Sequence, residues 1–326
     1  MKRFVQLSLS IIVLIGVLVG CSSKDENTVK IGYFPNLTHI ASIVALEKGY
    51  FAEEFGEDVE IETKTFSNGG LFMEAMQTKE IDIGTVGPGP LLNIYAKHPE
   101  FRIVSGAVNG GAVLVAAKEG GVESLEDLDG KKVAIPVIGS TQDVMLRKAL
   151  QEVDLKTTSS GGTVELYAAA PADSATLFVQ NSVEAAATQE PWGYILENQA
   201  EGNLLLGWDE FAWGKESTNT IVAASSEFTE NEEQTKEYLQ AHKRAVEFIQ
   251  ENEEEAQDLV IQHIKDLTGK EIDKAETEAA FSRLEVTTEV NEQVIQEMAD
   301  ISEEAGYVDS NDISGLIDLS IIEKIK

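Results

Sequence analysis

Cysteine is almost absent from this chain, because only one of its 326 residues, Cys21, is a cysteine. A single cysteine excludes intramolecular disulfides, and it leaves no Cys–His catalytic pair or cysteine-based metal site elsewhere. The four histidines are widely scattered. The chain also lacks a Gly-x-Ser-x-Gly elbow, a phosphate loop ending in Lys-Ser/Thr and a His-Glu-x-x-His helix. The sequence therefore predicts a protein that is not an enzyme and that holds no metal and no cofactor.

Basic residues are scarce as well, since 25 Lys and Arg stand against 57 Asp and Glu, for a net charge of −32. This charge opposes binding to nucleic acid or to an anionic membrane by simple electrostatic attraction. The acidic residues gather in stretches such as 230–233 and 251–255, which we interpret as solvated helix faces. No nucleic-acid partner is expected.

The N-terminal apolar run, at positions 11–19, is shorter than the roughly 20 residues that a membrane-spanning helix needs. Basic residues at positions 2–3 precede it, and this combination is typical of a secretory signal. The run ends in Leu18-Val19-Gly20-Cys21, which resembles the bacterial lipobox, whose cysteine is acylated. We expect residues 1–20 to be a lipoprotein signal peptide and 21–27 a tether. Lipidation of Cys21 would then hold the protein at the extracytoplasmic face of the cell membrane.

The rest of the chain, about 300 residues, suits two lobes better than one. A strand–helix rhythm runs from 29 to 105, is interrupted at Asn109-Gly110-Gly111, and restarts from 113 to 192. Such a rhythm predicts largely parallel sheets with helices on both faces. One further strand is expected at 221–224, and 227–326 is mainly helix-forming.

Several motifs, in order along nearly the whole mature chain, resemble those of the aliphatic sulfonate, taurine and nitrate group of ABC solute-binding proteins. They are Gly32-Tyr33-Phe34-Pro35-Asn36-Leu37-Thr38-His39, Ala45 to Phe51, Ile81-Asp82-Ile83-Gly84, Gly87-Pro88-Gly89-Pro90, Leu125 to Ala134, Gly139-Ser140-Thr141-Gln142-Asp143 and Glu190-Pro191-Trp192.

The resemblance implies an α/β, periplasmic-binding-protein-like (type II) fold, with two α/β lobes joined by a two-segment hinge at 108–112 and 218–222. Residues 28–110 plus 220–326 would form lobe one, and 111–219 lobe two. The implied function is that of a monomeric solute-binding protein of an ABC importer. It would deliver a small molecule from the cleft between the lobes to a permease and its ATPase.

In an open parallel sheet, ligands bind outside the carboxyl ends of the strands. The loops at 33–39, 66–70, 139–142 and 190–192 follow strands, and three of them open helices, whose free N–H groups attract anions. The candidate ligand-binding residues are Tyr33, Asn36, His39, Ser67, Asn68, Gly69, Gly70, Gly87, Ser140, Thr141, Gln142, Glu190 and Trp192.

Several of these residues also have structural interpretations. The Ser/Thr/Asn clusters can be plain helix caps, Trp192 can pack in the core, and Arg147 can face either the ligand or solvent. Glu190 opposes an anion unless the ligand also carries a cation, as an aminosulfonate does, or unless the carboxylate bonds backbone outside the pocket.

A small organic anion, first of all an aliphatic sulfonate, is the expected ligand. Nitrate, bicarbonate and a pyrimidine precursor of thiamine remain alternatives, as does a lipoprotein that presents its ligand to a sensor.

Overall fold

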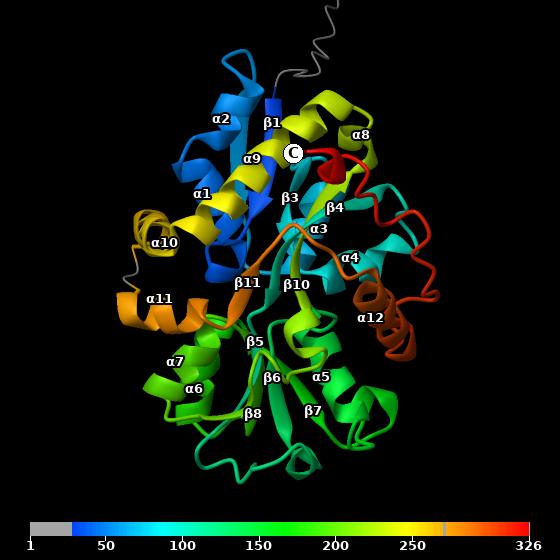
Figure 1. Cartoon of the computed structure of the whole chain (residues 1–326). Helices are drawn as coiled ribbons and strands as arrows, with labels where there is room; N and C mark the ends of the chain where they lie inside the picture. The colour runs from blue at the N-terminus through cyan, green and yellow to red at the C-terminus, as the bar shows by residue number, and fades with distance from the viewer. Residues whose placement is uncertain (1–27, 270–271, 326) are drawn as a thin grey trace, which may run out of the picture.

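Two β-sheets, each covered by helices, form two lobes that lie one above the other in Figure 1. This computed structural model describes residues 28–269 and 272–325. The predicted signal peptide, the tether and Cys21 lie outside the described residues. Within the described part of the chain, no helix is both long and apolar enough to cross a membrane.

The sheet of lobe one has six strands in the order β11-β4-β10-β3-β1-β2. β1 pairs in parallel with β2 and β3, whereas β10 is antiparallel to both of its neighbours and β11 is antiparallel to β4. Every residue of the central strand β3 is buried. The strands are β1 (Thr28–Tyr33), β2 (Glu60–Thr65), β3 (Ile83–Val86), β4 (Phe101–Gly110), β10 (Thr218–Ser225) and β11 (Leu284–Val286).

The sheet of lobe two has five strands in the order β7-β6-β8-β5-β9. β6 pairs in parallel with β7 and β8, and β5 is antiparallel to β8 and β9. The strands are β5 (Ala112–Ala116), β6 (Lys132–Ile135), β7 (Glu165–Ala168), β8 (Ala185–Gln189) and β9 (Asn203–Leu206).

The antiparallel strands are those that begin at the boundary between the lobes. β4 ends at Gly110 in the first sheet, and β5 begins at Ala112 in the second. β5 therefore runs away from the boundary between the lobes, whereas β8 runs toward it, and the two strands are antiparallel. β10 enters the first sheet from lobe two in the same manner. The chain returns through residues 207–217, between β9 and β10, and the segment 218–222 predicted as the second crossing lies inside β10.

Helices cover both sheets. The long helix α9 illustrates how an apolar helix face packs on a lobe. α9 buries Tyr238, Leu239, Val246 and Ile249 along one face, as expected of an amphipathic helix that packs on a lobe. The helices are α1 (Ile40–Glu47), α2 (Tyr50–Phe55), α3 (Gly69–Gln77), α4 (Pro88–Tyr95), α5 (Thr141–Gln151), α6 (Ser174–Val179), α7 (Trp192–Gln199), α8 (Ser226–Thr229), α9 (Glu232–Glu251), α10 (Glu253–Thr268), α11 (Lys274–Phe281) and α12 (Glu292–Glu304).

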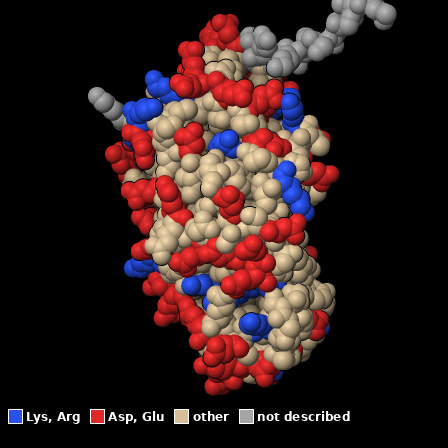
Figure 2. All heavy atoms as spheres, turned by 90° about the vertical axis from the view of Figure 1, so that its right-hand side faces the viewer, with Lys and Arg blue, Asp and Glu red and all other residues tan. Residues whose placement is uncertain are grey.

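The C-terminal third reaches back to lobe two on both sides of the molecule. α11 packs against α7, and α12 packs against α5 (Figure 1). The face in Figure 2 carries many acidic and fewer basic side chains along its length. The acidic stretches 230–233 and 251–255 are exposed, in agreement with the solvated faces inferred from the sequence. The sequence did not predict β9, β11 or α7 as separate elements.

Candidate ligand-binding cleft

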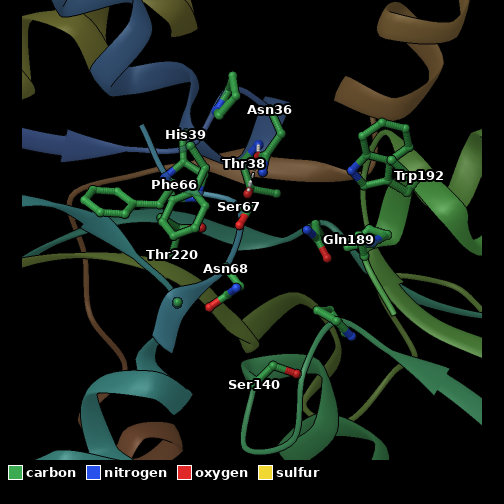
Figure 3. Close-up of a pocket in the computed structure, with 18 of the residues that line it drawn as sticks. Asn36, Thr38, His39, Phe66, Ser67, Asn68, Ser140, Gln189, Trp192 and Thr220 are labelled. Atoms are coloured by element: carbon green, nitrogen blue, oxygen red, sulfur yellow. Dashed lines mark hydrogen bonds between the residues drawn. The ribbon is translucent and has the colours of Figure 1, made fainter. Parts of the chain in front are cut away.

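A cavity of about 880 Å³ lies between the two lobes. Its walls come from the segments that follow β1, β2, β3, β6 and β8, together with the first residues of β10. Strands from both sheets therefore end at this cavity, as the rule for open α/β sheets requires. Figure 3 shows His39 and Phe66 on one side of it, Gln189 and Trp192 on the other, and Ser140 below.

Most of the predicted site residues line the cavity, and they come from segments that are far apart in the sequence. They are Asn36, His39, Ser67, Asn68, Gly69, Gly87, Ser140, Thr141, Gln142 and Trp192.

Three helix starts, those of α3, α4 and α5, meet at the cavity wall. A Cβ atom on Gly69 at the start of α3 would collide with the ring of Pro90 in α4. A Cβ atom on Gly89 in α4 would lie 2.7 Å from the backbone nitrogen of Thr141, the first residue of α5. The glycines therefore permit this close approach, which gathers the positive ends of three helix dipoles in one place.

The start of α5 is buried and engaged by protein groups. Ser140 caps the helix by accepting a hydrogen bond from the Asp143 N–H at 3.2 Å. The Thr141 hydroxyl accepts one from the Gly89 N–H of lobe one at 3.1 Å. The Gln142 side chain donates to Asn219 at 3.2 Å. These bonds tie the start of α5 to lobe one and to the first residues of β10.

The start of α3 is more open to the cavity. Asn68 caps it by accepting a hydrogen bond from the Leu71 N–H at 3.0 Å, while Ser67 is exposed. The N–H groups of Gly69 and Gly70 have no acceptor within the helix, because a helix leaves its first donors unsatisfied. Capping and ligand binding can therefore coexist here, since the cap uses the Leu71 N–H and not those of Gly69 and Gly70.

His39 is buried beside the cavity and is uncharged. Its Nδ1 shares a hydrogen bond of 2.8 Å with the Thr85 hydroxyl, and its ring lies 4.6 Å from that of Phe34, centroid to centroid. Burial lowers the pKa of His39 to about 3, because the charged imidazolium would lose its hydration. This side chain can donate or accept a hydrogen bond, but it brings no positive charge at neutral pH.

Full charges are few around the cavity. Among the described lining residues, Lys64 and Glu276 are the only Lys, Arg, Asp or Glu side chains, and Lys64 is paired with Glu80. Glu276 accepts a hydrogen bond from Gln199 at 3.2 Å. The described residues contain no cluster of three or more His, Cys, Asp or Glu side chains that could hold a metal ion.

One wall of the cavity is aromatic. Phe34 stacks on Phe72 with ring centroids 5.9 Å apart, and Phe66 meets Phe72 edge-on at 5.3 Å. Trp192 lines the opposite side, at the first position of α7. The walls therefore offer an apolar surface next to neutral polar groups, which is the usual composition of a small-molecule site.

Three predicted site residues do not line the cavity. Tyr33 is buried and its hydroxyl bonds His263 Nε2 at 2.9 Å. Gly70 lies one position beyond the lining residue Gly69. Glu190 is fully buried behind the wall, where it pairs with Arg283, so the alternative in which its carboxylate stays outside the pocket agrees with the structure.

Arg147 also lies outside the cavity wall. Its guanidinium is bound by Asp143 at 2.9 Å, by Ser160 at 2.9 Å and by Tyr307 at 2.7 Å. These partners account for the burial of Arg147, which lies nearly two turns into α5 and does not line this cavity.

Some lining residues were missed from the sequence. Gln189 is the last residue of β8, and the strand-end rule alone would have found it. Asn219 and Thr220 line the cavity at the start of β10, and Ile264, Thr268, Ile272 and Glu276 reach it from the C-terminal third. No local motif marks these last residues, since only tertiary packing brings them to the cleft.

The chain resembles known proteins over most of its length. A model of the NMT1-like family matches residues 22–264. A protein of Brucella abortus (strain 2308), named only as a binding protein, is 29% identical over 286 residues, which span 86% of this chain and 83% of the relative.

Solved structures share the fold at low sequence identity. The alkanesulfonate-binding protein from Xanthomonas axonopodis pv. citri, bound to MOPS, matches with a TM-score of 0.75 and 18% identity, over 90% of this chain and 98% of that chain. The nitrate-binding protein from Synechocystis PCC 6803 matches with a TM-score of 0.73 and 16% identity, over 92% and 88% of the two chains. These likenesses confirm the predicted periplasmic-binding-protein-like fold.

Proposed function

The chain belongs to the NMT1-like family, and on that premise we propose that it is the extracytoplasmic solute-binding component of an ABC importer. It captures a small organic anion, first of all a sulfonate, between its lobes and delivers it to a permease driven by an ATPase. Relatives of this fold include binding proteins for an alkanesulfonate and for nitrate, which supports a transport role over catalysis.

The observation that carries the proposal is the meeting of three helix starts at one cavity wall, where the only Lys or Arg among the described lining residues is Lys64, which is paired with Glu80. Helix-start N–H groups bind an anion without a counter-charge. A sulfonate is ionised at every ordinary pH, so fixed dipoles and neutral hydrogen-bond donors suffice to hold it. The Asn68, Ser67 and Gln142 side chains add such neutral donors nearby.

The size and lining of the cavity favour an anion with an apolar part. A volume of about 880 Å³ is within the range of sites for drug-sized ligands, roughly 300–1,000 Å³. Nitrate or bicarbonate alone would leave most of it to water. Phe34, Phe66 and Trp192 offer surfaces on which an alkyl chain or a ring can pack.

A thermal-shift screen of the purified protein tests the proposal directly. Alkanesulfonates, arylsulfonates, nitrate, bicarbonate and thiamine-precursor pyrimidines are added separately. A ligand at a hundred times its Kd stabilises the protein by about 2.7 kcal/mol. Stabilisation by sulfonates, recovered unchanged afterwards, supports the proposal. Stabilisation only by neutral or cationic compounds would refute the anion site, and turnover of the ligand would refute transport as the sole role.

The membrane anchor is a separate part of the proposal, and it rests on the lone Cys21 in its lipobox-like setting. The variant Cys21→Ala should be found uncleaved or released into the medium instead of anchored at mature size. A variant that stays anchored and processed would contradict lipidation. Membrane fractionation with a lipoprotein-specific label distinguishes the two outcomes.

A further inference from the structure

Glu190 lies behind the cavity wall, directly beside residues that form it. Its neighbours Gln189, Pro191 and Trp192 all line the cavity, while Glu190 itself is fully buried and turned away. One carboxylate oxygen accepts a hydrogen bond from the Tyr194 N–H at 2.9 Å, within the first turn of α7. Its other oxygen is 3.0 Å from the guanidinium of Arg283. The carboxylate thus fixes the turn that presents Trp192.

Arg283 belongs to the other lobe, because it stands between α11 and β11, the strand that pairs with β4. The pair therefore joins the lobes, and it does so at the first crossing. The Gly111 N–H donates to the Arg283 carbonyl at 2.8 Å, and the Glu190 N–H donates to the Gly111 carbonyl at 2.8 Å. With the Arg283–Glu190 side-chain bond, these contacts close a ring around Gly111, the residue between β4 and β5.

Two carboxylates near Gly111 share one basic side chain. Arg283 also forms a two-point ion pair with Glu197 of α7, so one guanidinium serves two acids, and its charge lies over the ring of Tyr194. Arg283, Glu197 and Tyr194 are the charged or titratable groups that face Glu190. Burial raises the pKa of Glu190 to about 7, because the ionised carboxylate would lose its hydration, and the nearby charge of Glu197 adds to the rise.

We propose that Glu190 and Arg283 form a hinge clasp, a positioning pair that stabilises the closed arrangement of the lobes and holds Trp192 against the ligand. The proposal rests on the ligand-capture function given above. Neither residue lines the cavity, so the clasp acts on how long the lobes stay closed. Opening would separate the pair and let water reach Glu190.

Removing either partner should therefore speed ligand release. In Glu190→Ala and Arg283→Met, release of butanesulfonate, measured by stopped-flow, should be roughly tenfold faster, since losing one partner of a buried hydrogen-bonded pair acts mainly on dissociation. Glu190→Gln keeps the shape and resembles the protonated carboxyl group, which also has only one carbonyl oxygen to accept these hydrogen bonds, so it should release at nearly the wild-type rate at pH 6.

The pH profile separates positioning from simple loss of structure. Glu190 binds its proton more tightly when buried in the closed state than when exposed in the open state, so a rise of pH through about 7 favours opening. Wild-type release should accelerate from pH 6 to pH 8, and Glu190→Gln should show a flat profile. Butanesulfonate does not change its protonation between pH 6 and pH 8, so the ligand adds no pH dependence of its own to the release rate.

Lys148→Met is the matched control. It removes another ion pair between the lobes, Lys148–Glu297 at 3.2 Å, which joins α5 to α12 away from this hinge segment. Its release rate should stay within about twofold of the wild type, as expected for a partly exposed pair. The clasp is overturned if Glu190→Ala and Arg283→Met release at the wild-type rate, or if Glu190→Gln keeps the wild-type pH slope.

A second measurement without ligand distinguishes failure of the clasp from failure of the proposed function. Amide hydrogen exchange of Gly111 reports directly on the ring around the hinge. Exchange should be faster in Glu190→Ala and Arg283→Met and unchanged in Lys148→Met. If the wild type binds no sulfonate but Gly111 responds in this way, the clasp stands and the ligand assignment falls. Unchanged exchange at Gly111 in both clasp variants refutes the clasp.

Discussion

Two helix starts with similar sequences face the cavity, yet the structure uses them differently. The start of α3 follows Ser67 and Asn68, and it is partly open to solvent. The start of α5 follows Ser140, and its first residues are buried against the glycines of α4. Hydroxyl, amide and glycine groups at the two helix starts therefore have different roles. In lobe one they leave backbone N–H groups open to the cavity, and in lobe two they form a contact with lobe one. What differs is the contact with α4. The backbone of Gly89 lies against the start of α5, whereas at the start of α3 the Pro90 ring approaches Gly69.

The largest effect is expected where α4 covers α5. In Gly89→Ala the new Cβ atom would lie 2.7 Å from the Thr141 backbone nitrogen and 2.9 Å from the Ser140 carbonyl carbon, so backbone must move. Overpacking of this kind costs about 1–3 kcal/mol, which would weaken sulfonate binding roughly fivefold to 150-fold by hindering closure. Isothermal titration calorimetry measures the change.

Gly70→Ala is the control at the open start. Its Cβ atom would meet only the Asn68 side chain, at 3.2 Å, which leaves the helix start accessible. Affinity within about threefold of the wild type is expected, because surface substitutions of this kind are nearly neutral. Equal losses in the two variants would show that the two starts are not distinguished by packing.

Thr141 tests the contact between the lobes with a smaller change. Thr141→Ala removes the acceptor of the Gly89 N–H and leaves that buried donor unsatisfied, which costs about 1–3 kcal/mol in the closed state. Binding should weaken about tenfold or more, since 1.4 kcal/mol is a factor of ten. Thr141→Ser retains the hydroxyl and should recover most of the affinity. If the serine variant binds as weakly as the alanine variant, the hydroxyl is not the operative group.

Adding a negative charge at Asn68 tests whether the anion binds at the open start of α3. Asn68→Asp can still cap α3, because aspartate accepts the Leu71 N–H as asparagine does, so the midpoint of thermal unfolding should not fall. The added negative charge should nevertheless oppose an anion and reduce affinity about tenfold or less. Asn68→Ala should do the reverse and lower stability by about 1 kcal/mol. A variant Asn68→Asp that binds sulfonate normally would place the anion elsewhere.

The fold was largely predictable because its signals are local. The strand predicted at 81–86 is β3 (Ile83–Val86), and strands of this kind alternate with capped helices. The break at Asn109-Gly110-Gly111 marks the point where β4 leaves the first sheet. The strands β9 and β11 were missed, because short strands of three or four residues carry little periodicity and depend on pairing with β5 and β4.

The cavity was predictable only where a local rule applies. The strand-end rule found Asn36, Ser67 and Ser140, each beside a helix start, and it placed Trp192 correctly in the lining. It could not find Ile272 or Glu276, since these residues follow no strand, and it could not exclude Tyr33 or Glu190. Whether a side chain at a strand end points into the cavity or away from it depends on distant partners such as His263 and Arg283.

His39 gives the smallest expected effect. It lies directly before α1, and its substitution tests whether a positive charge there adds to the donors of the helix starts. Its folded pKa of about 3 lies below the unfolded value, so His39 contributes stability above about pH 6.5 that is lost as the pH falls toward 3. Between pH 6 and pH 8 it stays neutral in the folded protein. Whatever pH dependence butanesulfonate binding has in this range, His39→Gln should therefore show the same slope as the wild type. If the wild type binds more tightly at pH 6 and His39→Gln loses that gain, the anion is held partly by an imidazolium. Helix dipoles and neutral donors alone would then be insufficient to hold the anion. The imidazolium of His39 would have to be counted as a binding group beside the two helix starts.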